Sequence, residues 1–312
     1  MSIHPGVMGI DISKDFLDIF DAEQNSFRRI GNAAGAVAEL ARGCAERGTF
    51  VRFEATGHYD AVLRHALSEA GVGFARVNPA RARDFARAAG YLAKTDAVDA
   101  RMLASMAQTL RPQVREASSP SRERLALWHK RRDQLVAMRQ QERTRRSDCA
   151  DPALAADLDQ HLTYLDNAIR TVERCIRDQL ARDRQMHHVQ SLLQTAPGVG
   201  LVTATTLIAL LPELGRRSPK TIAALAGLAP FNRDSGHHRG RRRIQGGRKR
   251  VRDALYMAAL VATRSDTVLR AAYLAMRNAG KAAKLALIAI ARKLLVILNA
   301  IVRDNAPFKY AT

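Results

Sequence analysis

The sequence is poor in cysteine, and it lacks both a membrane-length apolar run and a secretory leader. Its three cysteines (Cys44, Cys149 and Cys175) are widely spaced with no Cys-x-x-Cys pair, which argues against a disulfide framework and a zinc site. No apolar run is expected to reach the roughly 18 residues of a membrane span. Met1 to Gly6 lacks the basic-then-apolar layout of a signal peptide. We therefore expect a cytoplasmic protein without a membrane partner.

Acidic side chains are far outnumbered by basic ones in the second part of the chain. The formal charge is +20, yet residues 1–110 contain 13 basic and 13 acidic side chains, so the whole excess lies in residues 111–312. This division predicts that the second part binds a polyanion, while the first part has a task that needs carboxylates. No basic amphipathic helix with bulky apolar anchors stands out, which disfavours anionic lipid as the polyanion. Nucleic acid is the favoured partner.

The first hundred residues alternate short apolar stretches with helical patterns. Strands are expected at Val7–Ile10, Phe16–Phe20, Arg28–Ile30, Phe50–Phe53 and Gly73–Val77, and helices at Ala33–Arg47, Tyr59–Ala70, about 80–89 and about 95–108. Strands that first form a meander and then alternate with helices predict a mixed sheet with helices packed on it. The expected fold of residues 1–112 is therefore α/β.

A linker rich in proline and serine separates this domain from a long helical region. The linker is marked by Arg111-Pro112 and Ser118-Ser119-Pro120, and the helical region breaks at Asp151-Pro152, where Asp can cap and Pro can start a helix. One apolar seam follows the second helix and must pack on the preceding helix, on another subunit or on both. The seam comprises Leu154, Leu158, Leu162, Leu165, Ile169, Val172, Ile176 and Leu180. Residues 113–189 are thus expected to form a helical hairpin or coiled coil, and residues 190–312 a mostly α-helical C-terminal domain.

Two features of the helical part are compatible with nucleic acid but also have ordinary explanations. Six arginines make the first long helix basic, and they can form either a solvated face or a contact surface. The turn that contains Gly198 and Gly200 precedes the apolar helix Leu201–Leu211, as in a helix-hairpin-helix, where backbone N–H groups approach a phosphate. A simple tight turn explains these glycines as well. The arginines are Arg131, Arg132, Arg139, Arg143, Arg145 and Arg146.

Four carboxylates are placed where a metal site is expected. Asp11 and Glu54 each directly follow a strand, and they meet at one sheet edge if those strands are parallel neighbours. Asp96 and Asp99 are three residues apart in an expected helix and therefore share one face. Gathered acids repel one another unless a cation neutralises them, and hard oxygen ligands suit Mg²⁺ or Mn²⁺. Turn or capping roles remain open for each acid, and the neighbouring Asp15, Asp18 and Asp21 compete with Asp11.

A basic loop lies between residues 231 and 253, and it leads into an apolar helix, Ala254–Val261. Residues 233–252 contain nine Lys or Arg and a single acid, Asp234. An interior position and four glycines favour an ordered phosphate-binding loop over a disordered tail. The expected nucleic-acid contacts of this loop are Arg233, Arg239, Arg241, Arg242, Arg243, Arg248, Lys249 and Arg250.

Ser235 lies in the middle of this loop, directly before Gly236. A serine hydroxyl becomes a nucleophile when its proton is accepted or its developing anion is stabilised, and the surrounding arginines can hold a phosphodiester for attack. A turn residue or a simple phosphate hydrogen-bond donor is the alternative role for this serine. His237 and His238 can act as general acids or contact phosphate.

The motifs taken together resemble the DEDD transposases, the insertion-sequence recombinases guided by a bridge RNA. Three acidic motifs carry the resemblance in the first part of the chain: Gly9-Ile10-Asp11-Ile12-Ser13-Lys14, Glu54-Ala55-Thr56-Gly57 and Lys94-Thr95-Asp96-Ala97-Val98-Asp99-Ala100. Pro197-Gly198-Val199-Gly200, Leu225-Ala226-Gly227-Leu228-Ala229-Pro230, Asp234-Ser235-Gly236, Gly246-Gly247-Arg248, Ala254-Leu255-Tyr256-Met257-Ala258-Ala259-Leu260 and Ala291-Arg292-Lys293-Leu294-Leu295 are similar to the C-terminal transposase domain of that family. The similarity covers nearly the whole chain in order, whereas residues 111–190 match only in helical character.

The resemblance implies a ribonuclease H fold of the Holliday-junction-resolvase type for residues 1–112. It further implies that Asp11, Glu54, Asp96 and Asp99 bind Mg²⁺ and that Ser235 becomes linked to a DNA 5′ end. The implied partners are donor and target DNA, a noncoding bridge RNA whose loops pair with both, and further copies of the chain, as dimers that assemble into a tetramer. Delegating sequence choice to base pairing suits a protein that offers mostly phosphate contacts.

Two rival classes remain open from the sequence. A metal-dependent nuclease of the Holliday-junction type would use water as the nucleophile and leave no covalent protein–DNA adduct. A non-catalytic nucleic-acid-binding protein would need the basic part of the chain but not the acids, and it would show no dependence on Mg²⁺.

Overall fold

The computed structural model describes two compact units, which we call the N-terminal unit (Met1–Ala117) and the C-terminal unit (Ser118–Thr312). The described residues are 6–55, 57, 59–91, 95–110, 119–231, 234–235, 238–239, 243–265 and 267–309. The helices of the expected middle region, 113–189, are counted with the C-terminal unit. The division into three domains therefore stays a prediction.

The N-terminal unit is built on a five-stranded mixed sheet in the order β3-β2-β1-β4-β5. Its strands are β1 (Gly6–Ile12), β2 (Phe16–Asp21), β3 (Ser26–Gly31), β4 (Thr49–Glu54) and β5 (Phe74–Val77). The first three form an antiparallel meander, while β1–β4 and β4–β5 are parallel. Parallel pairing requires crossover connections, and helices supply both of them. The expected mixed α/β sheet is confirmed.

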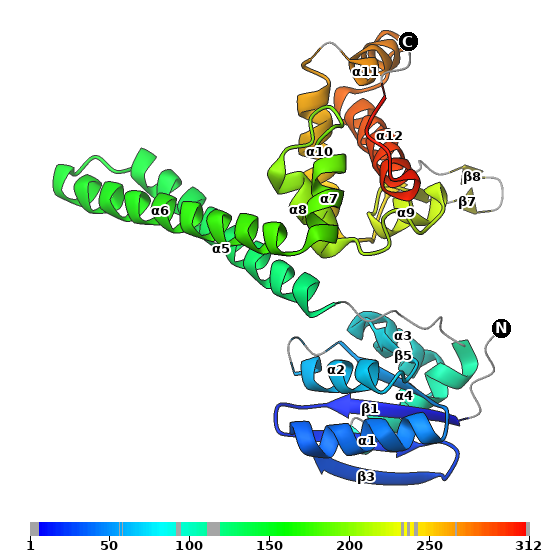
Figure 1. Ribbon diagram of the computed structural model, residues 1–312. Coiled ribbons are helices and arrows are strands. Elements are labelled where there is room, and N and C mark those ends of the chain that lie inside the picture. Colours follow the sequence, from blue (N-terminus) through cyan, green and yellow to red (C-terminus); the bar gives the residue numbers. More distant parts are fainter. Residues whose placement is uncertain are drawn as a thin grey trace. The chain divides into compact units, whose positions relative to one another are not determined.

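Helices cover both faces of this sheet, and alternation along β1 separates the two faces. On one face Met8, Ile10 and Ile12 pack against α1 (Ala34–Glu46) and α2 (Ala61–Glu69). On the other face lie α3 (Pro79–Ala88) and α4 (Asp96–Leu110). Figure 1 shows α1 and α2 lying in front of the strands. The expected strands and helices of this region are thus present, with ends shifted by one or two residues.

In the C-terminal unit, two long helices form an arm, visible in green in Figure 1. Helix α5 (Pro120–Ser147) is capped by the Ser119 side chain, and α6 (Pro152–Arg182) by Asp151, whose carboxylate accepts from two backbone N–H groups. Proline occupies the first turn of each helix, where no intrahelical N–H bond is lost. The expected break at Asp151-Pro152 is confirmed, and the apolar seam of α6 packs within the chain from Leu165 onward, whereas Leu154 is 54% exposed.

Ion pairs at heptad spacing join the two helices of the arm. Arg132 bonds Glu173, Arg139 bonds Asp166 and Arg146 bonds Asp159, with N···O distances of 2.7, 2.7 and 2.9 Å. The arginines are seven residues apart on α5, as are the acids on α6, so each pair recurs every two turns. Arg145 also bonds Glu142, at 2.8 Å. Four of the six arginines that were expected to form a solvated or nucleic-acid-binding face are therefore paired within the arm.

The rest of the C-terminal unit is a helical core with short strands at its surface. It comprises α7 (Arg184–Leu193), α8 (Leu201–Leu210), α9 (Pro219–Leu225), α10 (Lys249–Ala262), α11 (Val268–Asn278) and α12 (Ala283–Asp304). Four two-residue strands, β6 (Pro230–Phe231), β7 (Asp234–Ser235), β8 (His238–Arg239) and β9 (Arg243–Ile244), pair as β6–β9 and β7–β8. The expected helix at 201–211 is confirmed. The helix expected at 254–261 begins earlier, at Lys249, so Lys249, Arg250 and Arg252 belong to α10 and not to the basic loop.

Helix α12 corrects one expectation from the sequence. Of the described helices, α12 is long and apolar enough to cross a membrane by length and composition. No run of this length was expected from the sequence, and α12 reaches it although it contains Arg292 and Lys293. Half of its most apolar window is buried, and Ile290, Leu294 and Leu298 are fully buried against the other helices. These contacts are the pattern of a core helix.

Candidate active site

Neighbouring parallel strands bring two of the four acids to the same sheet edge. In the β1–β4 pair Ile10 lies opposite Phe53 at the carboxyl ends of the strands, so Asp11 and Glu54 are the next residues along them. Gly9 lies opposite Arg52, whose guanidinium donates to a backbone carbonyl of α4. Because side chains alternate along a strand, Asp11 and Glu54 share this α4-facing side of the sheet. The expected meeting of these two strand ends is confirmed.

Helix α4 brings the other two acids, and a glycine on β1 allows it to approach. A Cβ at Gly9 would lie 2.0 Å from the Ala100 carbonyl oxygen and 2.4 Å from the Ala104 nitrogen, so no side chain fits between β1 and α4. Asp96 and Asp99 lie in the first turn of α4, where negative charge is favourable. The Thr95 hydroxyl accepts from the Val98 N–H at 3.3 Å, so Thr95 takes the capping role that was considered for Asp96.

The electrostatics of Asp11 tie the four acids together. The pKa of the Asp11 carboxyl is raised from 3.8 to about 6, first by burial and then by the charges of Asp99, Asp96 and Glu54, against a lowering hydrogen bond from the Ile12 backbone. A carboxyl with three like charges near it is an arrangement that a cation relieves. Such perturbed groups are concentrated at functional sites.

The competing aspartates have other partners. Asp18 is buried and bonds Arg29 through both carboxylate oxygens, and Asp21 is buried and bonds Arg47 at 2.7 Å. Asp15 is exposed in the turn between β1 and β2. Among these neighbours, Asp11 is the acid whose charge faces the other three.

Two residues at this site were missed by sequence reasoning. Arg29 also bonds Asp96, at 2.8 Å. Asn32 donates from Nδ2 to the Ser13 and Tyr59 carbonyl oxygens at 3.1 and 3.0 Å, and it thereby ties the loop after Asp11 to the loop after Glu54. Both contacts join segments far apart in the chain, and no local pattern signals them.

The donors suit a hard divalent cation by their chemistry, since all four are carboxylates. Among the described residues no three acids, histidines or cysteines converge closely enough to form a finished metal site. One oxygen of Asp96, Oδ2, accepts a hydrogen bond from Arg29. The acids therefore form one electrostatic cluster around Asp11 without the geometry of ligands around an ion.

The basic loop is described only in part. Strands β7 and β8 are antiparallel and pair Asp234 with Arg239 and Ser235 with His238. Ser235 is therefore the last residue of the first strand in a short hairpin. Arg243 is exposed in β9. The expected contacts Arg233, Arg241 and Arg242, together with His237, lie outside the described residues.

Three predicted contacts at the start of α10 already have acidic partners. Arg248 forms a two-pronged pair with Glu213 at 2.6 and 2.7 Å, and Lys249 bonds Asp253 at 2.7 Å. Arg250 bonds Asp133 of α5. The pairs of Arg248 and Arg250 fix the base of the loop to the helical core, whereas Lys249 is paired within α10 itself. These structural roles sit beside the predicted contact with nucleic acid.

The two glycines of the expected phosphate-binding turn differ in their surroundings. A Cβ at Gly198, which has φ +78°, would lie 2.2 Å from the Ala258 carbonyl oxygen of α10, so close helix packing already requires this glycine. A Cβ at Gly200 would meet nothing within 4 Å, and this residue caps the N-terminus of α8. Gly200 is therefore the glycine whose backbone is open to a ligand.

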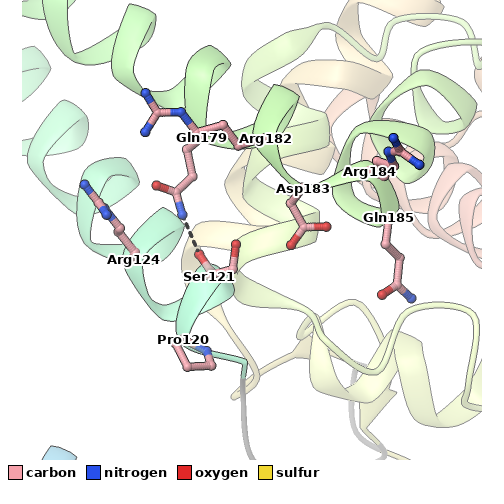
Figure 2. Close-up of a pocket in the computed structure, with 8 residues that line it drawn as sticks. All are labelled: Pro120, Ser121, Arg124, Gln179, Arg182, Asp183, Arg184 and Gln185. Carbon is pink, nitrogen blue, oxygen red and sulfur yellow. Dashed lines mark hydrogen bonds between the residues drawn. The ribbon is translucent and has the colours of Figure 1, made fainter.

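A basic pocket of about 650 Å³ lies where α5, α6 and α7 meet. Figure 2 shows Arg124, Arg182 and Arg184 around it, with the Gln179 amide donating to the Ser121 carbonyl oxygen at 3.0 Å. Its one acid, Asp183, caps α7 by accepting from the Met186 N–H. None of the three arginines forms an ion pair with another residue in the described part of the chain. The lining of the pocket therefore carries more positive than negative charge.

Four carboxylates clustered on a mixed sheet, joined to a strongly basic helical unit, define an enzyme that processes nucleic acid. Known families agree with this class. Residues 8–151 match the family model of the DEDD transposase of IS110, described as "Transposase", and residues 190–274 match the "Transposase IS116/IS110/IS902 family". The chain belongs to this IS110-type transposase family and is a DNA-cleaving enzyme.

Curated relatives point the same way. The "Pilin gene-inverting protein" of Moraxella bovis is 29% identical over 259 residues, which cover 82% of this chain and 80% of the relative, and its namesake in Moraxella lacunata matches equally. The "Insertion element IS116 uncharacterized 44.8 kDa protein" of Streptomyces clavuligerus is 33% identical over 157 residues, 50% of this chain and 38% of the relative. Similarity thus extends to proteins named for DNA inversion and for insertion elements.

Proposed function

We propose that the chain is an RNA-guided recombinase that cuts and rejoins donor and target DNA. In this proposal Asp11, Glu54, Asp96 and Asp99 hold Mg²⁺, or Mn²⁺ in its place, on a sheet of the ribonuclease H type. Ser235 is the nucleophile. The observation that carries the proposal is the charge cluster around Asp11, in which burial and three further carboxylates raise one pKa to about 6.

In the proposed cleavage reaction the Ser235 hydroxyl takes the place of water as the nucleophile. The Ser235 hydroxyl oxygen attacks a DNA phosphorus, loses its proton to a base, and forms a phosphoserine ester as the bond to the 3′ oxygen breaks. That oxygen leaves as a 3′ hydroxyl after taking up a proton, and the 5′ end stays on the protein. Bound divalent ions supply charge stabilisation for the entering and leaving oxygens. The ester conserves the energy of the phosphodiester, so a new 3′ hydroxyl can reverse the step.

RNA guidance and assembly rest on the family resemblance and on charge. A chain with +20 formal charge offers phosphate contacts, which position nucleic acid without specifying sequence. A bridge RNA that pairs with both duplexes would supply the sequence choice. Two duplexes with two strands each require four strand breaks, and four subunits, assembled as two dimers, supply one serine for each. We place this reaction in the cytoplasm.

Inversion is the second candidate outcome of the same chemistry. The relatives that cover most of this chain are named for pilin gene inversion, and inversion differs from insertion only in how the two sites lie on the DNA. A plasmid with paired sites in inverted orientation distinguishes the two outcomes, since inversion keeps both products on one circle.

Phosphate contacts are assigned to two surfaces of the C-terminal unit. One is the loop that contains Arg239, Arg241, Arg242 and Arg243, together with the open turn at Gly200. The other is the basic pocket of Figure 2, whose three arginines present planar donors suited to phosphate oxygens. Both surfaces lie in the part of the chain that holds the excess positive charge.

The metal-site assignment is tested by variants that remove one ligand charge each. Asp11→Asn, Glu54→Gln and Asp96→Asn should abolish cleavage of DNA in the presence of Mg²⁺, while RNA binding survives because it depends on the other unit. Asp15→Asn removes an exposed acid from the same hairpin and should cleave normally. Full cleavage by any two of the three ligand variants overturns the assignment, and full cleavage with chelator present favours a metal-independent reaction.

A further inference from the structure

Arg29 lies at the end of a row of charged residues that crosses three strands. In the β1–β2 pair Asp11 lies opposite Asp18, and in the β2–β3 pair Asp18 lies opposite Arg29. Directly opposed residues project from the same face of a sheet. Asp11, Asp18 and Arg29 therefore share the face that α4 covers.

The guanidinium of Arg29 joins a buried acid to an exposed one. Its Nε and Nη2 donate to the two oxygens of Asp18, both at 2.9 Å, and the same Nη2 donates to Asp96 Oδ2 at 2.8 Å. The Asp18 side chain is 3% exposed and that of Asp96 is 61% exposed. The ring of Phe16 packs under the guanidinium at 5.4 Å. Phe16 and Asp18 therefore fix the position of the Arg29 guanidinium independently of its contact with Asp96.

This arrangement orients Asp96 and leaves part of it available. Only Oδ2 of Asp96 is engaged, and Oδ1 forms no hydrogen bond with another described residue. Asp18 balances the charge of Arg29, so the bridge adds little positive charge to the cluster around Asp11. A free cation at the same place would instead neutralise the acids and compete with a metal ion.

We propose that Arg29 is a positioning residue that holds Asp96 by one oxygen so that the other can bind a divalent cation, with Asp18 as its anchor. The inference rests on the proposed metal site, and it adds two residues that the acidic motifs do not contain. Hydrogen-bonded partners that orient a ligand typically change metal affinity about 10–100-fold when removed.

The test measures Mn²⁺ binding to the full chain by titration calorimetry, with the thermal midpoint measured in chelator beside it. Arg29→Gln should weaken Mn²⁺ binding about 10–100-fold. Arg29→Lys keeps the charge but loses the planar fork, so it should recover only part of the affinity. Asp18→Asn should weaken binding in the same direction. Arg47→Gln is the matched control, because it breaks an equally short pair with buried Asp21 and should leave Mn²⁺ affinity unchanged.

The Mn²⁺ titrations distinguish a wrong metal site from a wrong role for Arg29. Equal Mn²⁺ binding by wild type and Asp11→Asn overturns the metal site itself. Binding that Asp11→Asn abolishes but Arg29→Gln and Arg29→Lys leave unchanged overturns only the positioning role, as does a lower thermal midpoint with unchanged affinity. Tighter binding by Arg29→Gln shows a competing cation and also overturns the inference.

Discussion

At the scale of single residues, the acids clustered around Asp11 lower the free energy of unfolding when no metal ion is bound. The pKa of Asp11 is raised from 3.8 to about 6, first by burial and then by three neighbouring acids. Between these two pH values the folded chain holds a proton that the unfolded chain has lost. Stability therefore falls as pH rises through this window, and above about pH 6 the full cost is present.

Asp11→Asn should remove this cost, because asparagine is neutral at every pH. In chelator at pH 7 the variant should be more stable than wild type by about 1–2 kcal/mol, because each pKa unit corresponds to about 1.4 kcal/mol and solvent screens part of the effect at this half-buried carboxyl. At pH 4 the two should unfold alike. Chemical denaturation followed by circular dichroism at both pH values measures the difference, and an equal gain at both pH values would contradict the assigned cause.

Residue-scale chemistry also shows what the sequence could and could not predict. The four acids were predicted because strand ends and helix spacing are local properties. Local pattern left Asp18 and Asp21 as competitors of Asp11, and the family resemblance alone favoured Asp11. The ion pairs that occupy the two competitors were not predictable, because Arg29 and Arg47 reach them across the fold. Both arginines stand in ordinary sequence surroundings, so their partners follow only from the strand pairing and from the packing of α1.

At the scale of elements, the site depends on how closely α4 lies on β1. Gly9→Ala places a methyl group against the Ala100 carbonyl oxygen, so α4 must move outward and take Asp96 and Asp99 with it. We expect this variant to lose Mn²⁺ binding although Gly9 is no ligand, and to lose about 1–3 kcal/mol of stability, as overpacked sites do.

The control for Gly9→Ala is Gly43→Ala in α1, where an added Cβ meets nothing within 4 Å. Alanine is favoured over glycine inside a helix by roughly 0.5–1 kcal/mol, so this variant should be slightly more stable and bind Mn²⁺ normally. Mn²⁺ titration and thermal unfolding of both variants make the comparison. Normal Mn²⁺ affinity in Gly9→Ala would mean that the position of α4 does not control the site.

The helices and strands were largely predictable from the sequence, whereas the partners of the arginines in the arm were not. Strand alternation and the seam of α6 were sufficient to place both sheet and hairpin, since each depends on local periodicity. The sequence left open whether the arginines of α5 face solvent or nucleic acid. Pairing of Arg132, Arg139 and Arg146 with acids at matching heptad spacing answers this for three of them. The seven-residue spacing of the arginines and of the acids can be read from the sequence. Which arginine pairs with which acid depends on how α5 and α6 are aligned, and the sequence alone does not give that alignment.

At the scale of the whole molecule, charge divides the chain into residues 1–110, whose charges balance, and residues 111–312, where 37 basic residues outnumber 17 acidic ones. Replacing Arg124, Arg182 and Arg184 with Gln should weaken nucleic-acid binding and flatten its dependence on salt, because each lost phosphate contact lowers the slope by about 0.9 for duplex DNA. Replacing Arg132, Arg139 and Arg146 with Gln removes the same charge from sites already paired with acids. This control should destabilise the arm yet change the slope little. Filter binding at several salt concentrations tests both, and equal slopes for the two variants would contradict the pocket assignment.

We propose that the acids of one unit and the serine of the other act in one reaction. A DNA substrate nicked so that the cut strand cannot be rejoined should trap a covalent adduct, with guide RNA and Mg²⁺ present. Denaturing electrophoresis and peptide mapping should place the DNA 5′ end on Ser235. Ser235→Ala should give no adduct while folding and RNA binding persist, since the change removes one oxygen from a polar, glycine-flanked loop. Asp11→Asn should give none either. Strand cleavage by the wild type without an adduct at Ser235, or normal recombination by Ser235→Ala, would contradict the account and favour hydrolysis by water.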